Sequence, residues 1–466
     1  AVADPTNLPS REEIRFNPGL NVETIIVEQD KLTHWIDNLE SDSEDSAFDD
    51  LDDDMGDLDV GPAEDKKDET QSGTDDAPIV RFVNKLLLDA IKGGASDLHF
   101  EPYEKTYRVR FRQDGILKTV SKPPINIASK LSARLKVMSR LDISERRVPQ
   151  DGRIKLKISK TRAIDFRVNT CPTLFGEKIV LRILDPESAK MGIEALGYEE
   201  DQKEMYLDAL HKPQGMILVT GPTGSGKTVS LYTGVNILNT PERNISTAED
   251  PVEINLEGIN QVNVNPKQGM DFSAALRAFL RQDPDVILVG EIRDLETANI
   301  AVKAAQTGHM VLSTLHTNSA ISSITRLRDI GLEPFLIASS LLGVIAQRLA
   351  RRLCQQCRES YQASDSEKNA LNIATDQPLT LWQPKGCPLC GGNGYQGRIA
   401  LFETFWMDDE MEALITEGAD ELTLRKKAKH FTSLADDGRE KVLQGLTTIQ
   451  ELKRLGLIQQ FEEVAA

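Results

Sequence analysis

The stretch MILVTGPTGSGKT, residues 216–228, decides the fold of this 466-residue chain. It opens with MILVT, an apolar run typical of a buried strand. It closes with GPTGSGKT, a complete match to the pattern G-x-x-x-x-G-K-[ST], and the helical span KTVSLYTGVNILN (227–239) overlaps its end. A strand, a glycine-rich turn and a helix in this order present backbone N–H groups and a helix N-terminus to phosphate oxygens. The segment therefore predicts a nucleotide-binding α/β domain.

Within this loop each residue type has a separate use. Lys227 is predicted to reach the β- and γ-phosphates of a nucleoside triphosphate, and the Thr228 hydroxyl to ligate Mg²⁺. An accidental glycine-rich turn is the alternative, and the strand and helix on either side disfavour it. The predicted phosphate-binding residues are Gly221, Pro222, Thr223, Gly224, Ser225, Gly226, Lys227 and Thr228.

Downstream of the loop, strand-like runs alternate with helical spans. NISTA (244–248), DVILVG (285–290) and HMVLSTLH (309–316) read as strands, and FSAALRAFLRQ (272–282) and ETANIAVKAAQTG (296–308) as helices. Such alternation is typical of a mostly parallel α/β sheet.

Upstream of the loop the pattern is different. A helical repeat of Val80, Val83, Leu86, Leu87 and Ile91 stops at Gly93-Gly94. Short alternating segments follow, which predict an α+β domain. The predicted strands are TYRVRFRQDGIL (106–117), GRIKLKI (152–158) and AIDFRVNTCPT (163–173).

A candidate catalytic carboxylate follows the predicted strand 285–290. The strands of nucleotide-binding sheets commonly end in an aspartate that helps hold Mg²⁺, but here Gly290 is followed by Glu291. A carboxylate at a rigid strand end can orient or deprotonate a water molecule, so Glu291 is the predicted catalytic carboxylate. Glu249 and Glu253 in STAEDPVE (246–253) could share the metal or its waters, and a simple turn is the weaker alternative for that stretch.

Histidine and arginine supply further candidates. His309 and His316 bracket a predicted strand; each alone is more often structural, but beside a phosphate site a histidine can sense γ-phosphate or water. Arginine neutralises phosphoryl-transfer charge and can come from another domain or subunit, whereas a solvated strand face is the simpler alternative for any one of them. The arginines ahead of the loop are Arg108, Arg110, Arg112, Arg146, Arg147, Arg153 and Arg167.

The cysteines form two pairs, each with a two-residue spacing. Cys354 and Cys357, then Cys387 and Cys390, give C-x₂-C…C-x₂-C with 29 residues between the pairs. Four thiolates on tight turns can close tetrahedrally around Zn²⁺, with no open position for catalysis, so we predict a structural zinc module. Disulfides are the alternative, and a cytosolic setting would oppose them. Cys171 is left over and is expected to pack as an apolar residue.

Net charge and hydropathy narrow the class of protein. The formal charge is −18 and the pI about 5.0, which disfavours a nucleic-acid partner. Residues 41–76 hold 16 acidic residues against two lysines, and thus carry −14 of that charge. We interpret this run as a flexible, solvated spacer; a docking tail for a basic partner is the alternative.

The longest apolar run, PFLIASSLLGVIA (334–346), is too short to span a membrane and is expected to open an amphipathic helix.

The N-terminal residues give an expectation about the cellular location. No basic-then-apolar secretory signal is visible at the N-terminus, so a cytoplasmic location is expected. The opening AVADPTN is abrupt, as if a preceding domain had been removed.

These motifs together resemble a known family. GPTGSGKT, STAEDPVEINLEGINQ, LRQDPDVILVGEIRD and TGHMVLSTLHTN, in that order, are similar to the phosphate loop, acidic box, atypical Walker B strand and histidine box of the type II/IV secretion ATPases, a superfamily of hexameric motors. The resemblance extends over about 78–455. It implies a RecA-like P-loop ATPase domain preceded by an α+β, PAS-like domain, with a small zinc-binding module and C-terminal helices. The four-cysteine module resembles that of the branch that assembles pili.

The resemblance also implies a division of the chain. The expected parts are 1–40, the end of a first N-terminal domain; 41–77, an acidic flexible linker; 78–192, a second N-terminal α+β domain; 193–350, the RecA-like ATPase domain; 351–405, the tetracysteine zinc module; and 406–466, a C-terminal helical part.

Roles for single residues follow from the same resemblance. It makes Glu291 the catalytic carboxylate, with Glu249 and Glu253 organising water and metal, and it makes His309 and His316 couple nucleotide state to movement. It implies that arginines of the second N-terminal domain close on the γ-phosphate. The best candidates for that closing role are Arg147, Arg153 and Arg167, with Arg277 and Arg281 as further candidates.

The expected activity is ATP hydrolysis by a homohexamer at the cytoplasmic face of a bacterial inner membrane, peripheral to it through partners. ATP, Mg²⁺ and Zn²⁺ are the expected cofactors. The motor would drive pilin polymerisation, and so type IV pilus extension, through an inner-membrane platform protein, with a cytoplasmic pilus alignment protein as a further candidate partner. The alternative is a type II secretion ATPase that drives pseudopilus assembly and protein export.

Three other interpretations are weaker. A retraction motor would lack the cysteine module. A non-enzymatic nucleotide-binding scaffold is opposed by Lys227 and Glu291, and a nucleic-acid translocase is opposed by the low pI.

Overall fold

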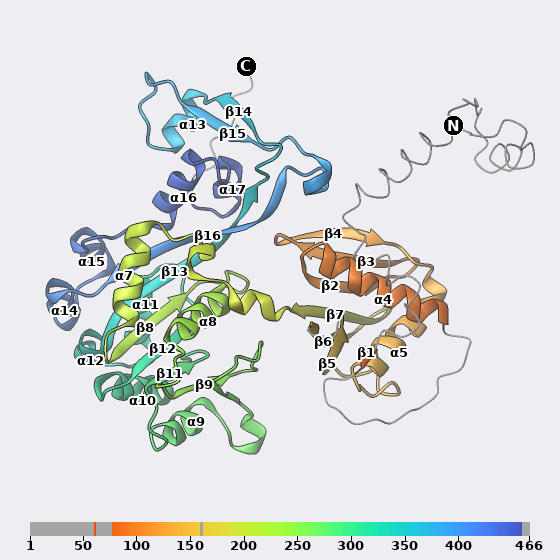
Figure 1. The fold of residues 1–466 in the computed structure, drawn as a ribbon, viewed down its shortest axis with the longest axis horizontal. Helices are drawn as coiled ribbons and strands as arrows, with labels where there is room; N and C mark the ends of the chain where they lie inside the picture. Colours follow the sequence, from red (N-terminus) through yellow and green to blue (C-terminus); the bar gives the residue numbers. More distant parts are fainter. Residues whose placement is uncertain (1–59, 62–76, 159–161, 459–466) are drawn as a thin grey trace, which may run out of the picture.

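The computed structural model describes residues 60–61, 77–158 and 162–458, which form two bodies and a cysteine-bearing projection (Figure 1). Each body is built on a seven-stranded sheet. The whole predicted interval 1–40 lies outside the described residues, as does most of the predicted linker 41–77. Two residues of that interval, Val60 and Gly61, form the short strand β1.

The N-terminal body contains an antiparallel sheet. Its strand order is β1-β5-β6-β7-β2-β3-β4, and every neighbouring pair runs antiparallel. The bounds are β1 (Val60–Gly61), β2 (Ala95–Pro102), β3 (Tyr107–Gln113), β4 (Ile116–Ser121), β5 (Gln150–Lys157), β6 (Ala163–Thr173) and β7 (Gly176–Leu184). The helices are α4 (Ala77–Lys92), η2 (Ile125–Ile127) and α5 (Ala128–Met138).

Period-two alternation gives this sheet one apolar and one polar face. Apolar side chains such as Phe100, Phe111 and Phe166 form a fully buried core with residues of α4 and α5. The predicted helix ends as expected, because α4 stops at Lys92 before the two glycines. The predicted strand 163–173 coincides with β6, and the predicted strand 106–117 is a hairpin divided into β3 and β4.

The second body contains a mostly parallel sheet, as predicted. Its order is β10-β9-β11-β12-β8-β13-β16, and only the edge strand β16 runs antiparallel to its neighbour. The bounds are β8 (Gly215–Thr220), β9 (Ile245–Glu249), β10 (Asn260–Asn263), β11 (Val286–Val289), β12 (Met310–Leu315), β13 (Leu341–Leu353) and β16 (Tyr395–Trp406). The helices up to β13 are α7 (Glu200–Leu210), α8 (Lys227–Leu238), η4 (Pro266–Gln268), α9 (Phe272–Phe279), α10 (Leu295–Gln306), α11 (Ser322–Ile330) and α12 (Pro334–Ser340).

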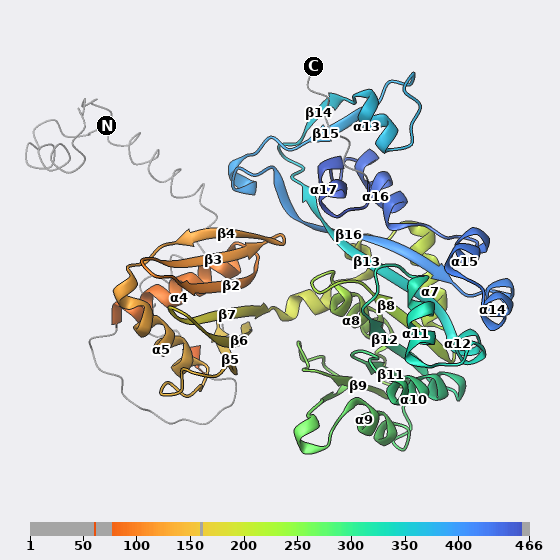
Figure 2. The ribbon, with the colours of Figure 1, turned by 180° about the vertical axis from the view of Figure 1, so that it is seen from behind.

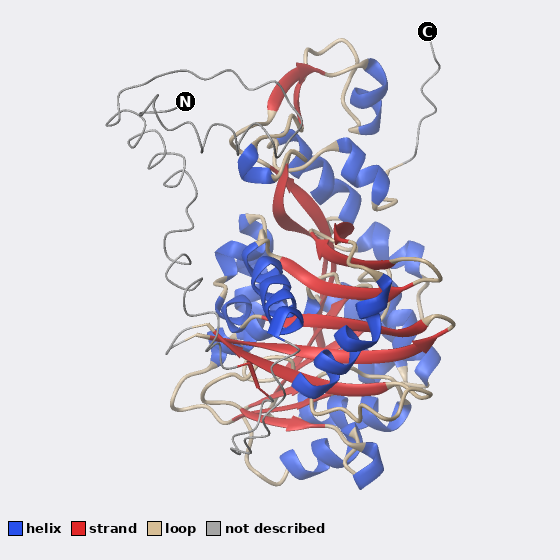
Figure 3. Ribbon diagram, turned by 90° about the vertical axis from the view of Figure 1, so that its right-hand side faces the viewer, coloured by secondary structure: helices blue, strands red, loops and turns tan. Residues whose placement is uncertain are grey.

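Helices cover both faces of this sheet, which explains its apolar strands. Every residue of β8, β9, β11 and β12 is buried, as is typical of parallel strands between two helical layers. Figure 3, seen from the side of the N-terminal body, shows strands across the middle of the molecule with helices around them. The carboxyl ends of these parallel strands meet at one edge, where ligands bind in open α/β sheets.

One sequence expectation needs correction. The segment 334–346 was expected to open an amphipathic helix, but α12 ends at Ser340 and the chain continues as the long strand β13. Apolar residues on both sides of Leu341 fit either a buried helix or a buried strand, so periodicity alone does not separate them. Because β13 and β16 both belong to the main sheet, they carry the cysteine-bearing segment between them.

The remaining elements form the projection and the C-terminal helices. β14 and β15 pair as a separate antiparallel ribbon. The bounds are β14 (Glu359–Gln362), α13 (Asp365–Ala370), β15 (Thr380–Gln383), η5 (Pro388–Cys390), α14 (Asp409–Thr416), α15 (Glu421–Lys427), α16 (Leu434–Leu443) and α17 (Ile449–Arg454).

The chain passes from β7 to the second body through η3 (Pro186–Lys190) and α6 (Ile193–Leu196), which Figure 2 shows between the two bodies. Among the residues that the structure describes, no helix combines the length and apolarity needed to cross a membrane.

Candidate nucleotide-binding and catalytic site

The predicted phosphate loop, residues 221–228, connects β8 to α8 at the carboxyl edge of the parallel sheet. Its tip, residues 222–224, is exposed to solvent. At its base Gly226 has φ 91°, and a Cβ there would lie 2.8 Å from the Gln347 side-chain nitrogen. The positive φ favours glycine at this position, which is the N-cap of α8.

Lys227 is the first residue of α8 and is folded against its own loop. Its Nζ donates to the carbonyl oxygens of Gly221 at 2.8 Å and Pro222 at 3.1 Å. Burial lowers the pKa of Lys227, and the neighbouring Arg348 adds to that effect while Glu291 opposes it. No carboxylate forms an ion pair with Lys227 among the described residues, so its charge can serve a bound phosphate.

Glu291 lies just beyond β11, as predicted, and has two basic neighbours. It forms an ion pair with Arg293, and its Oε2 lies 3.3 Å from Nε2 of His316. The Glu291 side chain is 13 % exposed, whereas that of His316 is 55 % exposed. His316 follows β12, the strand next to β11. A half-buried carboxylate between an arginine and a histidine at a strand end is a geometry suited to orienting a water molecule.

His309 lies at the opposite end of β12. Its Nδ1 is 2.9 Å from the carbonyl oxygen of Ala304, and it does not line the cleft described below. The structure therefore brings only one of the two predicted histidines to Glu291.

Glu249 ends β9 and is almost completely buried. Its carboxylate accepts hydrogen bonds from Thr247 at 2.6 Å, Tyr232 at 2.5 Å and Gln261 at 3.2 Å. Burial raises the pKa of the Tyr232 hydroxyl, and the nearby negative charge of Glu249 raises that pKa further. Glu253 follows in the same loop and lines the cleft. Glu249 is thus held rigidly, whereas Glu253 is open to a ligand.

These groups face one large cleft between the two bodies, with a volume of about 1540 Å³. The parallel sheet supplies the phosphate loop and the acidic residues, and the N-terminal body supplies arginines. The lining residues with these functions are Ser225, Lys227, Thr228, Glu249, Glu253, Glu291, Arg293 and His316 on one side and Arg112, Arg167 and Arg182 on the other.

The arginines on the N-terminal side form a row across the polar face of their sheet. Arg153 pairs in register with Arg167, and Arg167 with Arg182. Asp97 then stands between Arg182 and Arg112. Its Oδ1 accepts from Arg182 at 3.0 Å. Arg167 makes no ion pair with any residue that the structure describes, which leaves its guanidinium available to an anion.

The predicted arginines therefore divide into different settings. Arg167 lines the cleft, and Arg153 donates to the Val252 carbonyl oxygen in the acidic loop at 3.1 Å. Arg147 is 86 % exposed, pairs with Glu145 and lies outside the lining of the cleft.

Other arginines are engaged elsewhere. Arg108 and Arg110 bind Glu101, and Arg277 binds Glu296. Sequence reasoning missed Arg182, Arg293 and Tyr232. Arg293 could have been found, since it follows Glu291 by two residues, whereas Arg182 and Tyr232 reach the site only through strand register and helix packing.

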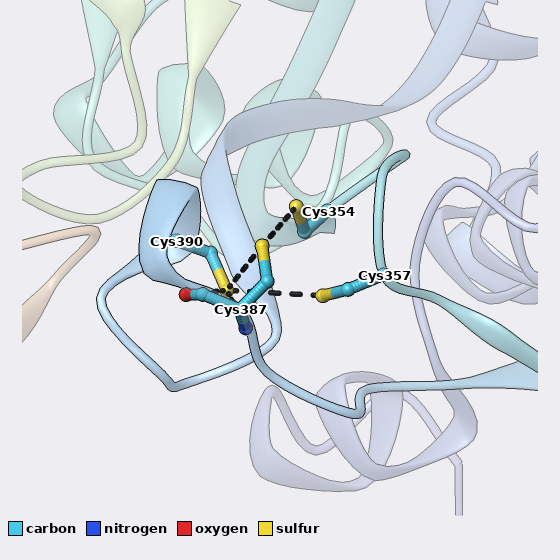
Figure 4. Close-up of side chains that lie close together, drawn as sticks. All are labelled: Cys354, Cys357, Cys387 and Cys390. Carbon is cyan, nitrogen blue, oxygen red and sulfur yellow. Dashed lines mark hydrogen bonds between the residues drawn. The ribbon is translucent and has the colours of Figure 1, made fainter. Parts of the chain in front are cut away.

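The four paired cysteines come together, as Figure 4 shows for their sulfur atoms. All four lie within 4.8 Å of one another. The sulfur–sulfur distances are 3.9 Å for Cys354–Cys387, 3.8 Å for Cys357–Cys390 and 3.7 Å for Cys387–Cys390. A tetrahedral Zn–S₄ centre with bonds of about 2.3 Å requires sulfur–sulfur separations of about 3.8 Å, so the residues fit zinc. Cys171, expected to be packed, is instead exposed.

The backbone around the cluster supports the same geometry. Amides of Cys387 and Gly394 donate to Cys390 Sγ at 3.2 Å each. Burial alone would raise the pKa of Cys390, but these amides and the neighbouring thiols lower that pKa to about 6. A Cβ on Gly386 would lie 2.4 Å from the Gly392 carbonyl oxygen, so the second turn closes only with glycine there.

Comparison with known proteins decides the family. Residues 72–454 match the family described as Type II/IV secretion system protein. The chain belongs to the type II/IV secretion ATPase family. It is 59 % identical over 461 residues to the "Type IV pilus assembly ATPase PilB" of Pseudomonas aeruginosa, covering 97 % of this chain and 81 % of that protein. It is 50 % identical over 382 residues to the "Type II secretion system ATPase E" of Vibrio cholerae, covering 82 % and 76 %.

Solved structures agree on the fold. The pilus retraction motor PilT, whose crystal structure contains bound ADP, superposes with a TM-score of 0.55 at 27 % identity, covering 79 % of this chain and 95 % of that one. The ATPase DotB of Legionella pneumophila gives a TM-score of 0.59 at 21 % identity, covering 83 % and 97 %. As a member of this ATPase family the chain hydrolyses ATP.

Proposed function

We propose that this chain is the ATP-driven motor that extends type IV pili, working as a homohexamer. The observation that carries the proposal is the 59 % identity to the Pseudomonas aeruginosa pilus assembly ATPase over 97 % of the chain. Similarity to the type II secretion ATPase of Vibrio cholerae covers 82 % of the chain at 50 % identity.

The arrangement of the cleft supports a division of labour in hydrolysis. Lys227 and the loop amides would bind the β- and γ-phosphates. Glu291 would orient the attacking water, held between Arg293 and His316. Arg167 and Arg182 would stabilise the charge of the transferring phosphoryl group when the two bodies approach.

Magnesium fits the oxygen donors of this cleft. The Thr228 hydroxyl and the carboxylates of Glu249, Glu253 and Glu291 line the same wall, and Mg²⁺ prefers such hard ligands together with phosphate oxygens. When bound, the ion would supply charge neutralisation of the β- and γ-phosphates.

Zinc is proposed for the four cysteines on the evidence of their sulfur separations. The centre would hold the loops between β13 and β16, and so fold the projection rather than take part in catalysis. The purified chain is expected to contain one zinc per protomer by elemental analysis. Cys387→Ser should lose that metal, whereas Cys171→Ser should retain it.

Partners and location follow from the proposed role. The motor would lie in the cytoplasm at the inner membrane, peripheral to it, and pass rotation to an inner-membrane platform protein. A cytoplasmic pilus alignment protein is a further candidate partner. A nucleic-acid partner is not proposed because the chain is acidic, with a net charge of −18.

The second candidate is a type II secretion motor, favoured by the 50 % identity to the Vibrio cholerae protein. A strain deleted for this chain separates the two candidates. The proposal expects surface pili to disappear while secreted enzymes persist, with pili restored by the wild-type chain and not by Lys227→Ala. Loss of secreted enzymes with normal pili would instead establish the secretion role.

A further inference from the structure

The five residues that follow β12 cross the carboxyl edge of the parallel sheet, and we call them the crossing segment (residues 316–320). β12 is followed in the sheet by β8, β13 and β16, in that order (Figure 1). The segment leaves β12 beside Glu291, and the chain then enters α11, which begins at Ser322. It lies between the proposed catalytic carboxylate and the far edge of the sheet.

Successive residues of the crossing segment bind successive strands. The amide of Thr317 donates to Thr220 Oγ1 at the end of β8, at 2.9 Å. The Asn318 side chain accepts from Arg348 Nη2 on β13, at 3.1 Å.

The last contact reaches the edge strand. The amide of Ala320 donates to Glu403 Oε1 on β16, at 2.7 Å. Each contact therefore lies one strand further from β12.

Strand register explains why the crossing segment can pass over the ends of β8, β13 and β16. Thr220 is paired with Ala346, and Ala346 with Glu403. Paired residues point to the same face of a sheet, so a small side chain stands between the two polar ones. Ala346 is 1 % exposed, which indicates that other atoms cover it.

Arg348 is partly buried and Glu403 is buried, and neither forms an ion pair within the described residues. One terminal nitrogen of Arg348, Nη1, is buried without a hydrogen bond. Glu403 is 3 % exposed, and burial raises its pKa against the lowering effect of the Ala320 and Leu434 amides. Burying a charged group or one of its polar atoms is costly unless that group is hydrogen-bonded, and both side chains form a hydrogen bond with the crossing segment.

We propose that Arg348 and Glu403 are positioning residues for ATP hydrolysis, which fix the crossing segment and through it hold His316 against Glu291. Within the described residues they form no hydrogen bond with the phosphate loop or with Glu291, and the proposed effect on turnover passes through His316. Arg348 also lies near Lys227, so a variant that leaves Arg348 in place is needed to test the segment itself. Glu403 also links the segment to the start of α16 through the Leu434 amide, which connects the catalytic edge with the C-terminal helices. The inference rests on the proposed roles of Glu291 and His316.

The decisive variant is Asn318→Ala, because Asn318 is exposed and its loss removes only the Arg348 contact. In the full-length hexamer we expect kcat to fall about tenfold with the KM for ATP changed less than twofold, as for one lost orienting hydrogen bond. In a His316→Gln background the same change should lower kcat less than twofold further. Thr325→Ala is the matched control, since it removes one exposed hydrogen bond from the neighbouring helix α11.

A second pair of variants tests Glu403. Glu403→Gln keeps an acceptor for the Ala320 amide and is expected to retain at least half of the wild-type kcat, whereas Glu403→Leu is expected to lower kcat about tenfold at unchanged hexamer mass.

Two contrary results have different meanings. If His316→Gln leaves kcat unchanged, the role of His316 fails and the inference fails with it. If Asn318→Ala and His316→Gln each slow turnover and their effects multiply, His316 keeps its role and the inference alone is overturned. An Asn318→Ala enzyme with wild-type kcat overturns it as well.

Discussion

The two seven-stranded sheets of this chain use their surfaces in opposite ways. In the parallel sheet, β8, β9, β11 and β12 are buried along their whole length, and the polar groups stand at the strand ends. In the antiparallel sheet, one face is a core and the other carries a register row with arginines on β5, β6, β7 and β3 and Asp97 on β2. The parallel sheet therefore places its polar functional groups at one edge, whereas the antiparallel sheet places them on one face.

The difference follows from how each sheet is covered. Helices on both sides of a parallel sheet leave only its carboxyl edge open to a ligand. An antiparallel sheet packed on one side keeps a solvated face, where cross-strand pairs can align like charges. Like charges in register repel one another, so such a row is stable only with counter-charges or with an anion to bind. Asp97 provides that counter-charge for Arg182, whereas Arg167 has none among the residues that the structure describes.

The largest effect is expected at the edge of the parallel sheet. Glu291→Gln should lower steady-state ATPase activity about 10³-fold, about 4 kcal/mol in activation free energy, because it removes the carboxylate proposed to orient water. ATP binding should persist, since the phosphate loop is unchanged. Activity of the purified hexamer and binding of a fluorescent ATP analogue measure the two quantities. Glu242→Gln, on an exposed loop, is the control.

A smaller effect is expected on the arginine face. Arg167→Ala should lower kcat about 10²-fold through lost stabilisation of phosphoryl charge. Arg81→Ala, on the exposed side of α4, should have little effect. If Arg167→Ala and Arg81→Ala show equal turnover, the polar face of the antiparallel sheet takes no part in catalysis. The proposed contrast between a functional sheet edge and a functional sheet face would then be wrong.

The opposite end of the same polar face should affect stability rather than rate. Burial alone would raise the pKa of the Glu101 carboxyl. Hydrogen bonds from the cations Arg110, Lys178 and Arg108 lower that pKa to about 2. A lowered carboxyl pKa stabilises the fold above its unfolded value of about 4.5, and this stabilisation is lost as the pH falls from there toward about 2.

Glu101→Gln should therefore destabilise the N-terminal body by about 2 kcal/mol at pH 7, after allowance for solvent screening of the partly exposed cations. The difference from wild type should narrow below about pH 4.5. Urea unfolding followed at several pH values measures it, with the exposed Glu104→Gln as control. A difference in the free energy of unfolding between Glu101→Gln and wild type that stays constant with pH would contradict the lowered pKa of Glu101.

The smallest effect concerns the buried carboxylate at the parallel edge. Tyr232→Phe removes one of three hydrogen bonds to Glu249, so we expect about 1 kcal/mol, or a kcat about fivefold lower. Tyr206→Phe is matched to it, because among the described residues the Tyr206 hydroxyl donates only to the backbone carbonyl oxygen of Ser230, at 3.4 Å. Equal activity in the two variants would show that the orientation of Glu249 is unimportant.

Sequence could predict the edge of the parallel sheet because its chemistry is local. The loop 221–228 and Glu291 each follow a strand within a few residues, so a motif contains both the element and the functional group. Family resemblance added the roles of the acidic residues and the two histidines, and the structure brings only His316 to Glu291.

The arginine face could not be predicted in the same way. Whether Arg182 stands beside Arg167 depends on the register of β6 against β7, which no single segment encodes. The strand β13 was missed because an apolar run after Pro334 fits a helix or a strand equally well, and its pairing with β8 and β16 decides the outcome.

The central claim is that a nucleoside triphosphate binds the loop at the parallel edge and is cleaved with the help of Glu291. A structure of the chain with a non-hydrolysable ATP analogue and Mg²⁺ tests it most directly. We predict the terminal phosphates on the amides of residues 221–228 and beside Lys227, with the Glu291 carboxylate facing the terminal phosphoryl group through one water molecule. An analogue bound elsewhere, or a Glu291 side chain turned away from the terminal phosphoryl group, would contradict the account.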